Sequence, residues 1–391
     1  MNYPKLAGYF GHRYGGSPLI TATGSLDEPL IKKLARFPLM TLEIAPWFSI
    51  EGYGRTDAIQ LIRRTNPGAK VLKYQLGTHW HLPPTFIPAT TDQSWPATWH
   101  RGIQRTNGWL YGSNGQLIPG YEVDWSKRET ADSQTDLLCA AAASRIFNGL
   151  FLDYWTWQLG TAGGAIDPAK APPAMDNARR VNMRRAVLRI REAGGPGYVV
   201  LGNGVGEQPW LDGEFREGFP APLNSFEQVR TWREERRLPE DWIQAGTGIT
   251  DSTTADAMRA ARFALGTACL LGTHCSFGPD RNSAITPYYG TWWFDEYSVN
   301  QAGNADTTGA STGWLGDPTA TGAQIMPGVW RRDFDGGTVL VNSGVGATVD
   351  LGADSRLKRI RGVLDPVTNT GVQERSPTVR ARDALFLVRA R

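Results

Sequence analysis

Cysteine, net charge and long apolar runs are all scarce in this chain. Its three cysteines are an odd number at no metal-binding spacing, which argues against a disulfide framework and favours buried thiols. The 41 basic and 38 acidic residues nearly cancel over 391 positions, so no electrostatic footprint for nucleic acid is expected. No apolar run approaches the roughly 20 residues that a membrane-spanning helix requires. These absences predict a globular protein whose partners are neither nucleic acid nor membrane.

Several motifs of cofactor and nucleophile chemistry are missing as well. Residues 202–206 resemble a dinucleotide-binding loop, but Glu207 stands where its third glycine belongs and Pro209 prevents a helix from opening there. No Gly-x-Ser-x-Gly elbow and no P-loop occur. His79 and His81 could share a strand face, but no carboxylate stands at ligand spacing from them. We therefore predict neither a cofactor nor a metal.

The N-terminal segment gives little information on location. Residues 1–11 lack the basic start and the long apolar run of a signal peptide. The expected location is the cytoplasm by default, and the extracellular space if the chain is a trimmed piece.

What the chain does contain is an alternation of short β-like runs with amphipathic helical segments. This order is typical of βα units around a parallel sheet. The eight predicted strands lie at residues 6–12, 39–46, 70–76, 149–154, 198–202, 213–217, 242–247 and 269–277. The predicted helices lie at residues 27–37, 56–65, 133–145, 177–193, 225–237 and 254–265. Eight strands predict an α/β fold of the (β/α)8, or TIM barrel, type.

Two segments depart from this alternation. Residues 77–131 are rich in Pro, Gly, Trp and His and form a long insertion, which on a barrel would extend a loop of the active face. After Pro327 no helical pattern remains, and strands are predicted at residues 329–334, 338–342, 348–351, 357–364 and 384–388. The predicted domains are a barrel over residues 1–326 and a small antiparallel β-sandwich over residues 327–391.

Tryptophan and arginine both gather in particular places. Many of the fifteen tryptophans fall in loop-like contexts, where each could stack on the flat apolar face of a sugar or pack into the core. The loop tryptophans are Trp80, Trp95, Trp99, Trp109, Trp125, Trp155, Trp157, Trp292 and Trp293. Arginines repeat through residues 179–191 with apolar residues at near-helical spacing, which predicts the solvated outer face of a helix.

The strongest local signal is the run from Gly149 to Trp155, an apolar strand that ends in Asp153, Tyr154 and Trp155. A carboxylate at the end of an apolar run is costly unless it is hydrogen-bonded or functional. At the C-terminal end of a barrel strand it points into the active face. Asp153 is therefore a candidate catalytic residue, with a helix cap or a buried salt bridge as the structural alternative.

Cleavage of a glycosidic bond needs two carboxyl groups that flank the scissile bond. The second must come from another strand end, and Glu217 lies at the end of the predicted sixth strand. Glu227 is its main competitor, but it stands at the start of a helix, where glutamate often only caps. Further candidates for contact with substrate are Glu43, Tyr74, Glu122, Asp124, Tyr154, Trp155, Asn203 and Asp295, the last beside Glu296.

The order of elements and three short motifs resemble barrel-type glycoside hydrolases related to the endo-α-1,4-polygalactosaminidases and the melibiase-like barrels. The matched motifs are Gly149-x-Phe151-x-Asp153, Asn203-Gly204 and Asp212-Gly213-x-x-x-Glu217. The likeness spans about residues 6–300, and the insertion after the third strand departs from the simplest members. The resemblance implies that Asp153 is the nucleophile, that Glu217 is the proton donor and that the anomeric configuration is retained.

The sequence thus predicts a retaining glycosidase that degrades an oligosaccharide or polysaccharide, with a carbohydrate as its partner. The alternative is a non-catalytic carbohydrate-binding barrel within a larger assembly. The two differ in whether a second carboxylate lies within reach of Asp153.

Overall fold

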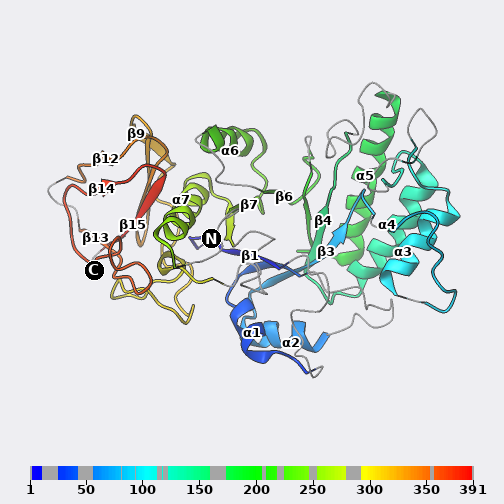
Figure 1. Ribbon diagram of the computed structural model, residues 1–391, viewed down its shortest axis with the longest axis horizontal. Helices are drawn as coiled ribbons and strands as arrows, with labels where there is room; N and C mark the ends of the chain where they lie inside the picture. Colours follow the sequence, from blue (N-terminus) through cyan, green and yellow to red (C-terminus); the bar gives the residue numbers. More distant parts are fainter. Residues whose placement is uncertain are drawn as a thin grey trace.

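The computed structural model describes residues 2–10, 25–42, 56–80, 82–92, 94–111, 117, 122–158, 173–204, 208–217, 224–245, 253–278, 292–352 and 356–389. Two sheets dominate the elongated molecule, with helix α7 between them (Figure 1). The larger sheet forms a barrel, and the smaller one is built from the C-terminal residues. None of the helices within these ranges is long and apolar enough to cross a membrane.

The larger sheet contains eight parallel strands in sequence order, which confirms the predicted (β/α)8 fold. They are β1 (Ala7–Phe10), β2 (Leu39–Leu42), β3 (Lys70–Leu76), β4 (Gly149–Asp153), β5 (Val199–Gly202), β6 (Gly213–Arg216), β7 (Trp242–Ala245) and β8 (His274–Phe277). A parallel bridge between Leu6 and Cys275 links the first strand to the last. The Cys275 amide donates to the Lys5 carbonyl at 2.9 Å, so the sheet closes on itself.

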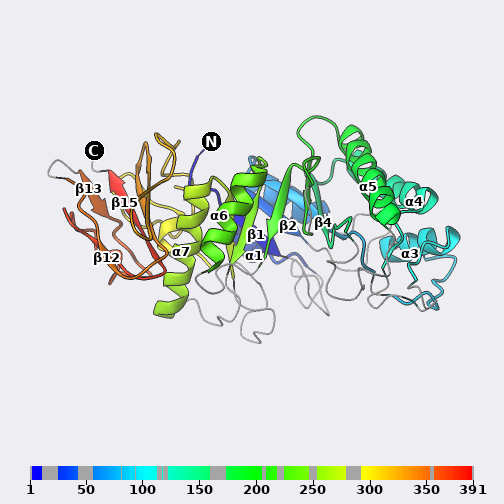
Figure 2. The same ribbon diagram turned by 90° about the horizontal axis from the view of Figure 1, so that it is seen from above.

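Helices cover the outside of the barrel (Figures 1 and 2). They are α1 (Glu28–Leu34), α2 (Thr56–Thr65), α3 (Trp95–Arg105), α4 (Arg128–Ala143), α5 (Pro173–Gly194), α6 (Asn224–Arg236) and α7 (Ala255–Leu271), followed by the short 3-10 helix η3 (Asp295–Tyr297). Between β5 and β6 the described residues contain no helix.

Aromatic and branched side chains fill the barrel interior, as expected for a packed core rather than a pore. The Tyr9 ring stacks on Phe215 with centroids 5.2 Å apart, and the Trp242 indole donates to the Ser276 hydroxyl at 2.8 Å. The buried interior cluster consists of Ala7, Tyr9, Leu39, Leu72, Tyr74, Phe151, Val199, Leu201, Phe215 and Trp242.

The prediction of a strand over 269–277 was wrong in its first part. Helix α7 continues through Cys269 to Leu271, because the alanine- and leucine-rich run remains helical until Gly272. Gly272 adopts a left-handed conformation with φ of 76°, which glycine accepts without steric cost and which ends the helix. Strand β8 begins only at His274.

The insertion over 77–131 contains a helix that sequence analysis missed. Helix α3 begins after Ser94, whose hydroxyl accepts from the Ala97 amide, and has a proline in its first turn. The two tryptophans of this helix, Trp95 and Trp99, are buried. Six of the loop tryptophans are buried and pack into the core: Trp80, Trp95, Trp99, Trp109, Trp125 and Trp155.

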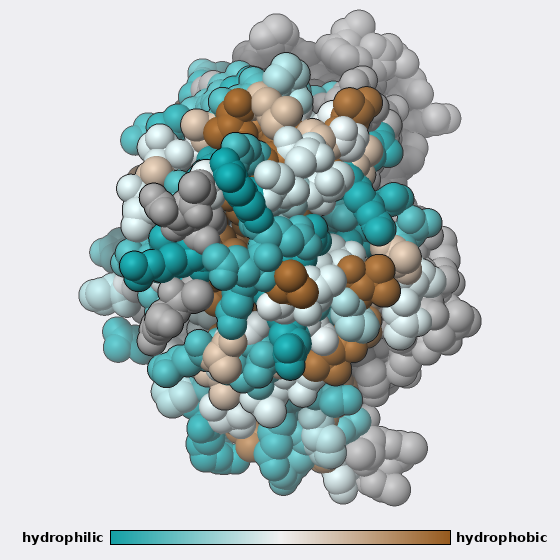
Figure 3. All heavy atoms as spheres, turned by 90° about the vertical axis from the view of Figure 1, so that its left-hand side faces the viewer, coloured by the Kyte–Doolittle hydropathy of each residue, from teal (hydrophilic) through white to brown (hydrophobic). Residues whose placement is uncertain are grey.

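The C-terminal region forms a five-stranded antiparallel sheet faced by a two-stranded one, as predicted. Its strands are β9 (Ala323–Met326), β10 (Val329–Phe334), β11 (Gly337–Asn342), β12 (Ala347–Thr348), β13 (Leu357–Arg359), β14 (Thr378–Val379) and β15 (Asp383–Arg389). Because β9 pairs with β10, this sheet starts before residue 327. At the outer end of the region, apolar side chains form separate patches among hydrophilic ones (Figure 3).

Helix α7 packs on both sheets and so joins the two regions. A side chain at Gly266 would have its Cβ 2.6 Å from Ala384 Cβ and 2.8 Å from Val341 Cγ2. Glycine therefore lets the helix axis approach the C-terminal sheet closely. The barrel and the C-terminal sheet share one continuous apolar core through this contact.

Candidate active site

Asp153 ends β4 at the C-terminal mouth of the barrel, and its side chain is only 2% exposed. Three donors converge on its carboxylate. The Tyr74 hydroxyl donates to Oδ2, the Asn203 side-chain amide donates to Oδ1 at 2.8 Å, and the Tyr154 backbone amide donates to Oδ1 at 2.9 Å. Hydrogen bonds to the charged form stabilise an ionised carboxylate. The arrangement therefore suits a carboxylate that stays charged although it is buried.

Glu217 directly follows β6, and its side chain is exposed. Its Oε1 accepts a hydrogen bond of 3.0 Å from the same Asn203 nitrogen that binds Asp153. Because the two contacts, of 2.8 and 3.0 Å, share one nitrogen, the Asp153 and Glu217 oxygens lie no more than 5.8 Å apart, the sum of both. The predicted pair of carboxylates is thus brought together at one end of the barrel.

The backbone of Asn203 is hydrogen-bonded to the residues around Asp153. Its amide donates to the Leu152 carbonyl at 2.9 Å, and its carbonyl accepts from the Trp155 amide at 2.7 Å. These two hydrogen bonds connect the residue after β5 to Leu152 and Trp155, which lie on either side of Asp153. This fixes the position from which the Asn203 side chain reaches both carboxylates.

Trp155 is fully buried and supports the site from behind. Its ring packs edge-on against Trp125, with centroids 4.8 Å apart. Glycines make room for it: a Cβ at Gly77 would lie 2.6 Å from the Trp155 ring, and one at Gly204 would lie 2.1 Å from its carbonyl oxygen. Sequence analysis proposed Trp155 as a sugar contact, and the structure places it in the wall beneath the site.

Tyr154 is the aromatic residue of this motif that reaches the surface, with 42% of it exposed. Its backbone is left-handed, with φ of 49°, which costs energy for a residue other than glycine. The Thr78 hydroxyl donates to its carbonyl at 2.5 Å. The imidazole of His79 stacks on its ring at a centroid distance of 4.7 Å and an angle of 23°.

Glu122 lies inside the protein, next to this surface. Its Oε1 accepts from Arg179 Nη2 at 2.8 Å, and its Oε2 lies 2.8 Å from His79 Nδ1. Arg179 is fully buried, which contradicts the predicted solvated face for this part of α5. The helical spacing could have predicted this burial, because Arg179 lies on the same helix face as the buried residues Asn182 and Met183.

Asp124 and Glu227 serve local structure. Asp124 Oδ1 accepts from the Ser126 amide at 3.0 Å and from its hydroxyl at 2.5 Å, in the turn that leads into α4. Glu227, the competitor for the second carboxylate, is exposed in the first turn of α6 and pairs with Arg230 at 2.8 Å. Glu43 and His81 lie outside the described residues.

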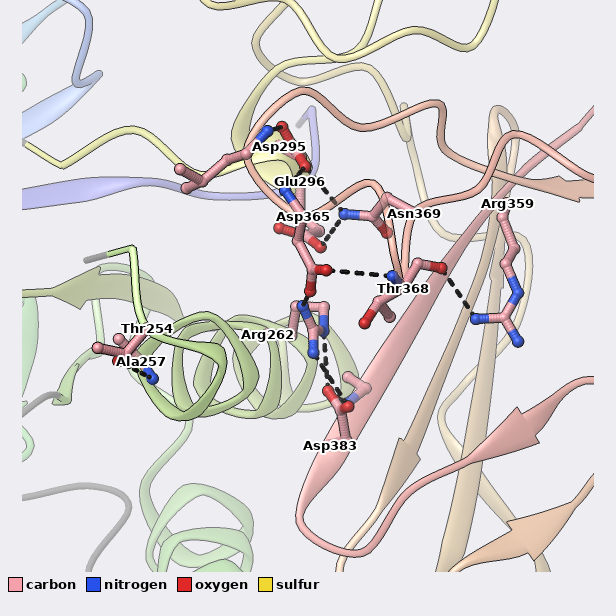
Figure 4. Close-up of polar contacts among 12 residues, drawn as sticks. Thr254, Ala257, Arg262, Asp295, Glu296, Arg359, Asp365, Thr368, Asn369 and Asp383 are labelled. Carbon is pink, nitrogen blue, oxygen red and sulfur yellow. Dashed lines mark hydrogen bonds and ion pairs between the residues drawn. The ribbon is translucent and has the colours of Figure 1, made fainter. Parts of the chain in front are cut away.

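Asp295 belongs to a different cluster, at the junction between the barrel and the C-terminal sheet (Figure 4). Its carboxylate accepts from the backbone amides of Val363, Leu364 and Asp365 at 2.9 to 3.0 Å. It also accepts from the Asn369 side chain at 3.3 Å. The structure therefore does not bring Asp295 to the carboxylate pair but uses it to hold a loop.

The same junction contains a buried arginine. Arg262 of α7 forms ion pairs with Asp365 and with Asp383, the latter at 2.9 Å (Figure 4). Glu296 accepts from the Asn369 side chain at 2.8 Å, and burial raises its pKa to about 7. Sequence analysis missed this cluster, whose members come from segments far apart in the chain.

Among the residues that the structure describes, no group of three or more histidine, cysteine, aspartate or glutamate side chains could hold a metal ion. Tyr74, Tyr154 and Asn203 each donate a hydrogen bond to Asp153 at the barrel mouth. The site thus contains two carboxylates that are joined through a side-chain amide.

The fold and this site define a (β/α)8-barrel protein with a C-terminal antiparallel sheet and two carboxylates at the barrel mouth. No family model matches the chain, and no curated protein matches it.

Solved structures of similar fold do exist. A pullulanase from Anoxybacillus sp. LM18-11 superposes with a TM-score of 0.52 and 12% identity, over 98% of this chain and 69% of that one. The same enzyme complexed with maltotriose gives a TM-score of 0.50 and 12% identity, over 95% and 65% of the two chains. An α-amylase from Malbranchea cinnamomea aligns over 98% and 96%, with 11% identity and a TM-score of 0.48. At these identities the likeness shows the fold alone.

Proposed function

We propose that this protein is a glycoside hydrolase that cleaves O-glycosidic bonds in an oligosaccharide or polysaccharide with retention of configuration. The observation that carries the proposal is the shared Asn203 nitrogen, which keeps the Asp153 and Glu217 oxygens within 5.8 Å. Retaining glycosidases have carboxyl groups about 5 to 5.5 Å apart, whereas inverting ones need about 6.5 to 9.5 Å to admit a water molecule.

The surroundings of the two carboxylates support different roles for them. Asp153 is buried and receives three hydrogen bonds, which favour the charged form that a nucleophile needs. Glu217 is exposed, so it can exchange a proton with the leaving group and then with water. We therefore assign Asp153 as the nucleophile and Glu217 as the general acid and base.

In the first step an Asp153 oxygen attacks the anomeric carbon while the glycosidic bond breaks, and the leaving oxygen takes its proton from Glu217. In the second step water attacks the same carbon and gives its proton to the Glu217 carboxylate. The bond to Asp153 then breaks, and both side chains return to their starting states. Asn203 and Tyr74 hold the nucleophile in place through both steps.

The class of sugar is inferred from the fold neighbours and from the motifs around the two carboxylates. One pullulanase of similar fold has been solved both by itself and in complex with maltotriose. The motifs around Asp153, Asn203 and Glu217 resemble polygalactosaminidase and melibiase-like barrels. The first substrates to test are therefore α-linked: maltotriose, melibiose, α-1,4-linked galactosamine oligomers and the corresponding aryl α-glycosides.

The proposal is tested by measuring hydrolysis of α- and β-linked aryl glycosides and polysaccharides with four proteins: wild type, Asp153→Asn, Glu217→Gln and Glu227→Gln. We expect the first two variants to lose activity and Glu227→Gln, an exposed glutamate on α6, to keep it. Azide should restore turnover to Asp153→Ala, because a small anion can take the place of the missing carboxylate.

Two results would overturn the assignment. Undiminished activity of Asp153→Asn would exclude it as the nucleophile. Saccharide binding by wild type without cleavage of any substrate would favour a non-catalytic carbohydrate-binding barrel instead.

A further inference from the structure

Three polar side chains form a hydrogen-bonded series that leads from the interior to the surface beside Asp153. It runs from Arg179 through Glu122 to His79. Glu122 and Arg179 are buried almost completely, while the side chain of His79 keeps 24% of its exposure. None of these three side chains has a role in the function proposed above, although His79 lies against Tyr154, the residue that follows Asp153.

Glu122 is fixed by the arginine behind it. Arg179 Nη2 also donates to the Thr156 carbonyl at 3.1 Å, and its Nη1 donates to the Val123 carbonyl at 3.1 Å. These contacts hold the guanidinium in one orientation, and the guanidinium holds one Glu122 oxygen. The second oxygen is left to accept from His79, because a buried carboxylate is costly unless both oxygens find donors.

The contact with Glu122 determines which nitrogen of His79 is available. A carboxylate accepts only, so Nδ1 carries the proton that it donates to Glu122. Nε2 is the remaining polar atom of the ring, and the residues that the structure describes give it no hydrogen-bond partner. The contact with Glu122 therefore fixes the orientation of the imidazole and leaves Nε2 able to bind a ligand.

The ring of His79 also packs against the surface tyrosine of the site. The two rings stack at 4.7 Å, and the Tyr154 amide donates to Asp153 Oδ1 at 2.9 Å. The left-handed backbone of Tyr154 is a strained conformation of the kind that occurs at ligand-binding sites. The exposed Tyr154 thus directly follows the buried Asp153 in the chain, and His79 stacks on the Tyr154 ring.

We propose that His79 and Tyr154 form a sugar-binding subsite beside the Asp153–Glu217 pair. The Nε2 atom of His79 hydrogen-bonds a sugar hydroxyl, and the exposed ring of Tyr154 packs on an apolar face of the sugar. Glu122 is a positioning residue that acts through His79, and Arg179 supports it. This subsite deepens the proposed glycosidase function and rests on it.

Two amide substitutions separate the nitrogens of His79. Asparagine places its amide near the position of Nδ1 and can keep the contact with Glu122, whereas glutamine reaches the position of Nε2. The experiment measures binding of maltotriose, melibiose and α-1,4-linked galactosamine oligomers by calorimetry, in an Asp153→Asn background that cannot turn them over. Tyr154→Ala is compared with Tyr111→Ala, which removes a tyrosine of similar exposure (48%) in the insertion.

We expect His79→Asn to weaken binding about five- to tenfold, the effect of losing one hydrogen bond to the ligand. His79→Gln should lose less than about threefold for the same reason, since it can restore that bond. Tyr154→Ala should weaken binding by about tenfold, as expected for a lost stacking surface, and Tyr111→Ala should leave it unchanged. In the active enzyme, Glu122→Gln should raise KM more than it lowers kcat, because it frees the His79 ring.

Equal affinity of the His79→Asn and parent proteins would overturn the subsite, and so would equal losses in the two amide variants. Failure of the Asp153→Asn protein to bind any of the three saccharides would also count against it. If Glu122→Gln does not fold, the two His79 variants decide the question. The expected binding pattern without turnover by the wild type would refute the hydrolase and leave the subsite standing.

Discussion

Acidic side chains gather in two regions of this molecule, and the two clusters differ in how their charges are balanced. At the barrel mouth, Asp153 and Glu217 share a neutral amide, and Glu217 is open to solvent. At the junction with the C-terminal sheet, Asp365 and Asp383 pair with the buried Arg262, and Asp295 accepts from three backbone amides. Glu217 in the first cluster is exposed to solvent, whereas Asp295, Asp365 and Asp383 in the second are all buried.

The difference distinguishes the proposed catalytic carboxylates from those that hold the junction together. Both Asp153 and Asp295 stand next to aromatic residues in the sequence, and both looked like contacts for a sugar. Only the structure shows that Asp295 is enclosed by a loop that arrives about 70 residues later. Removal of a charge should therefore affect chemistry at the mouth and stability at the junction.

The largest expected effect is on catalysis at the mouth. Glu217→Gln keeps the size of the side chain and can still accept from Asn203, but it cannot transfer a proton. We expect kcat to fall by about 100- to 10,000-fold, the usual value of general acid–base catalysis, with little change in the free energy of unfolding. Steady-state kinetics and urea denaturation of the same preparation test both halves of this prediction, and a stability loss as large as that of a junction variant would contradict it.

The largest effect on stability is expected at the junction. Arg262→Met leaves Asp365 and Asp383 buried without a cation, which should cost about 3 to 5 kcal/mol of unfolding free energy. Arg189→Met is the matched control, since Arg189 pairs with Asp132 and Asp136 on the surface, where a pair contributes about 0 to 1 kcal/mol. Chemical denaturation measures both, and equal losses in the two variants would contradict the contrast.

A smaller, pH-dependent effect is expected at Glu296. Burial raises its pKa from 4.5 to about 7 in the folded protein, so the folded state binds its proton more tightly than the unfolded state. Its contribution to stability is therefore fully present below pH 4.5 and is lost as the pH rises to about 7. Glu296→Gln should remove this loss, which is on the order of 3 kcal/mol, and should make the protein more stable than wild type above pH 7. Unfolding curves of both proteins at several pH values test this, and parallel pH profiles would refute it.

The smallest effect concerns the support of the nucleophile. Tyr74→Phe removes one of the three donors to Asp153 and leaves the ring that stacks on Phe151. We expect kcat to fall about tenfold, in line with the loss of one hydrogen bond to a charged group. The kinetics should show an unchanged KM, because Tyr74 donates to Asp153, the proposed nucleophile, and is not proposed to contact the sugar. A rise in KM alone would contradict this prediction.

The barrel was predictable from sequence because its elements carry local signals. The predicted helix over 56–65 and the predicted strands over 70–76 and 329–334 agree with the structure at both ends. Helix α3 was missed because its tryptophans, histidine and proline are weak helix formers, and only the core around them makes the helix stable. The short strands β9 and β14 likewise depend on their partners in the sheet.

The site was predictable to the extent that strand ends converge. Asp153 is the last residue of β4, and Asn203 and Glu217 directly follow β5 and β6, so all three lie at the same mouth of a parallel barrel. The pairing of Arg179 with Glu122 joins α5 to a residue of the insertion 57 positions earlier, and no local pattern encodes it. Burial and partner choice of this kind arise only from tertiary packing.

The proposed action of Asp153 and Glu217 as a retaining pair can be tested by determining the anomeric configuration of the first product. Proton NMR of a freshly started reaction, on the aryl glycoside that the wild type cleaves fastest, records the anomer before mutarotation. We expect the initial product to have the same anomeric configuration as the substrate. An initial product of the opposite configuration would show that the two carboxylates activate water directly, and it would contradict the assignment of Asp153 as nucleophile.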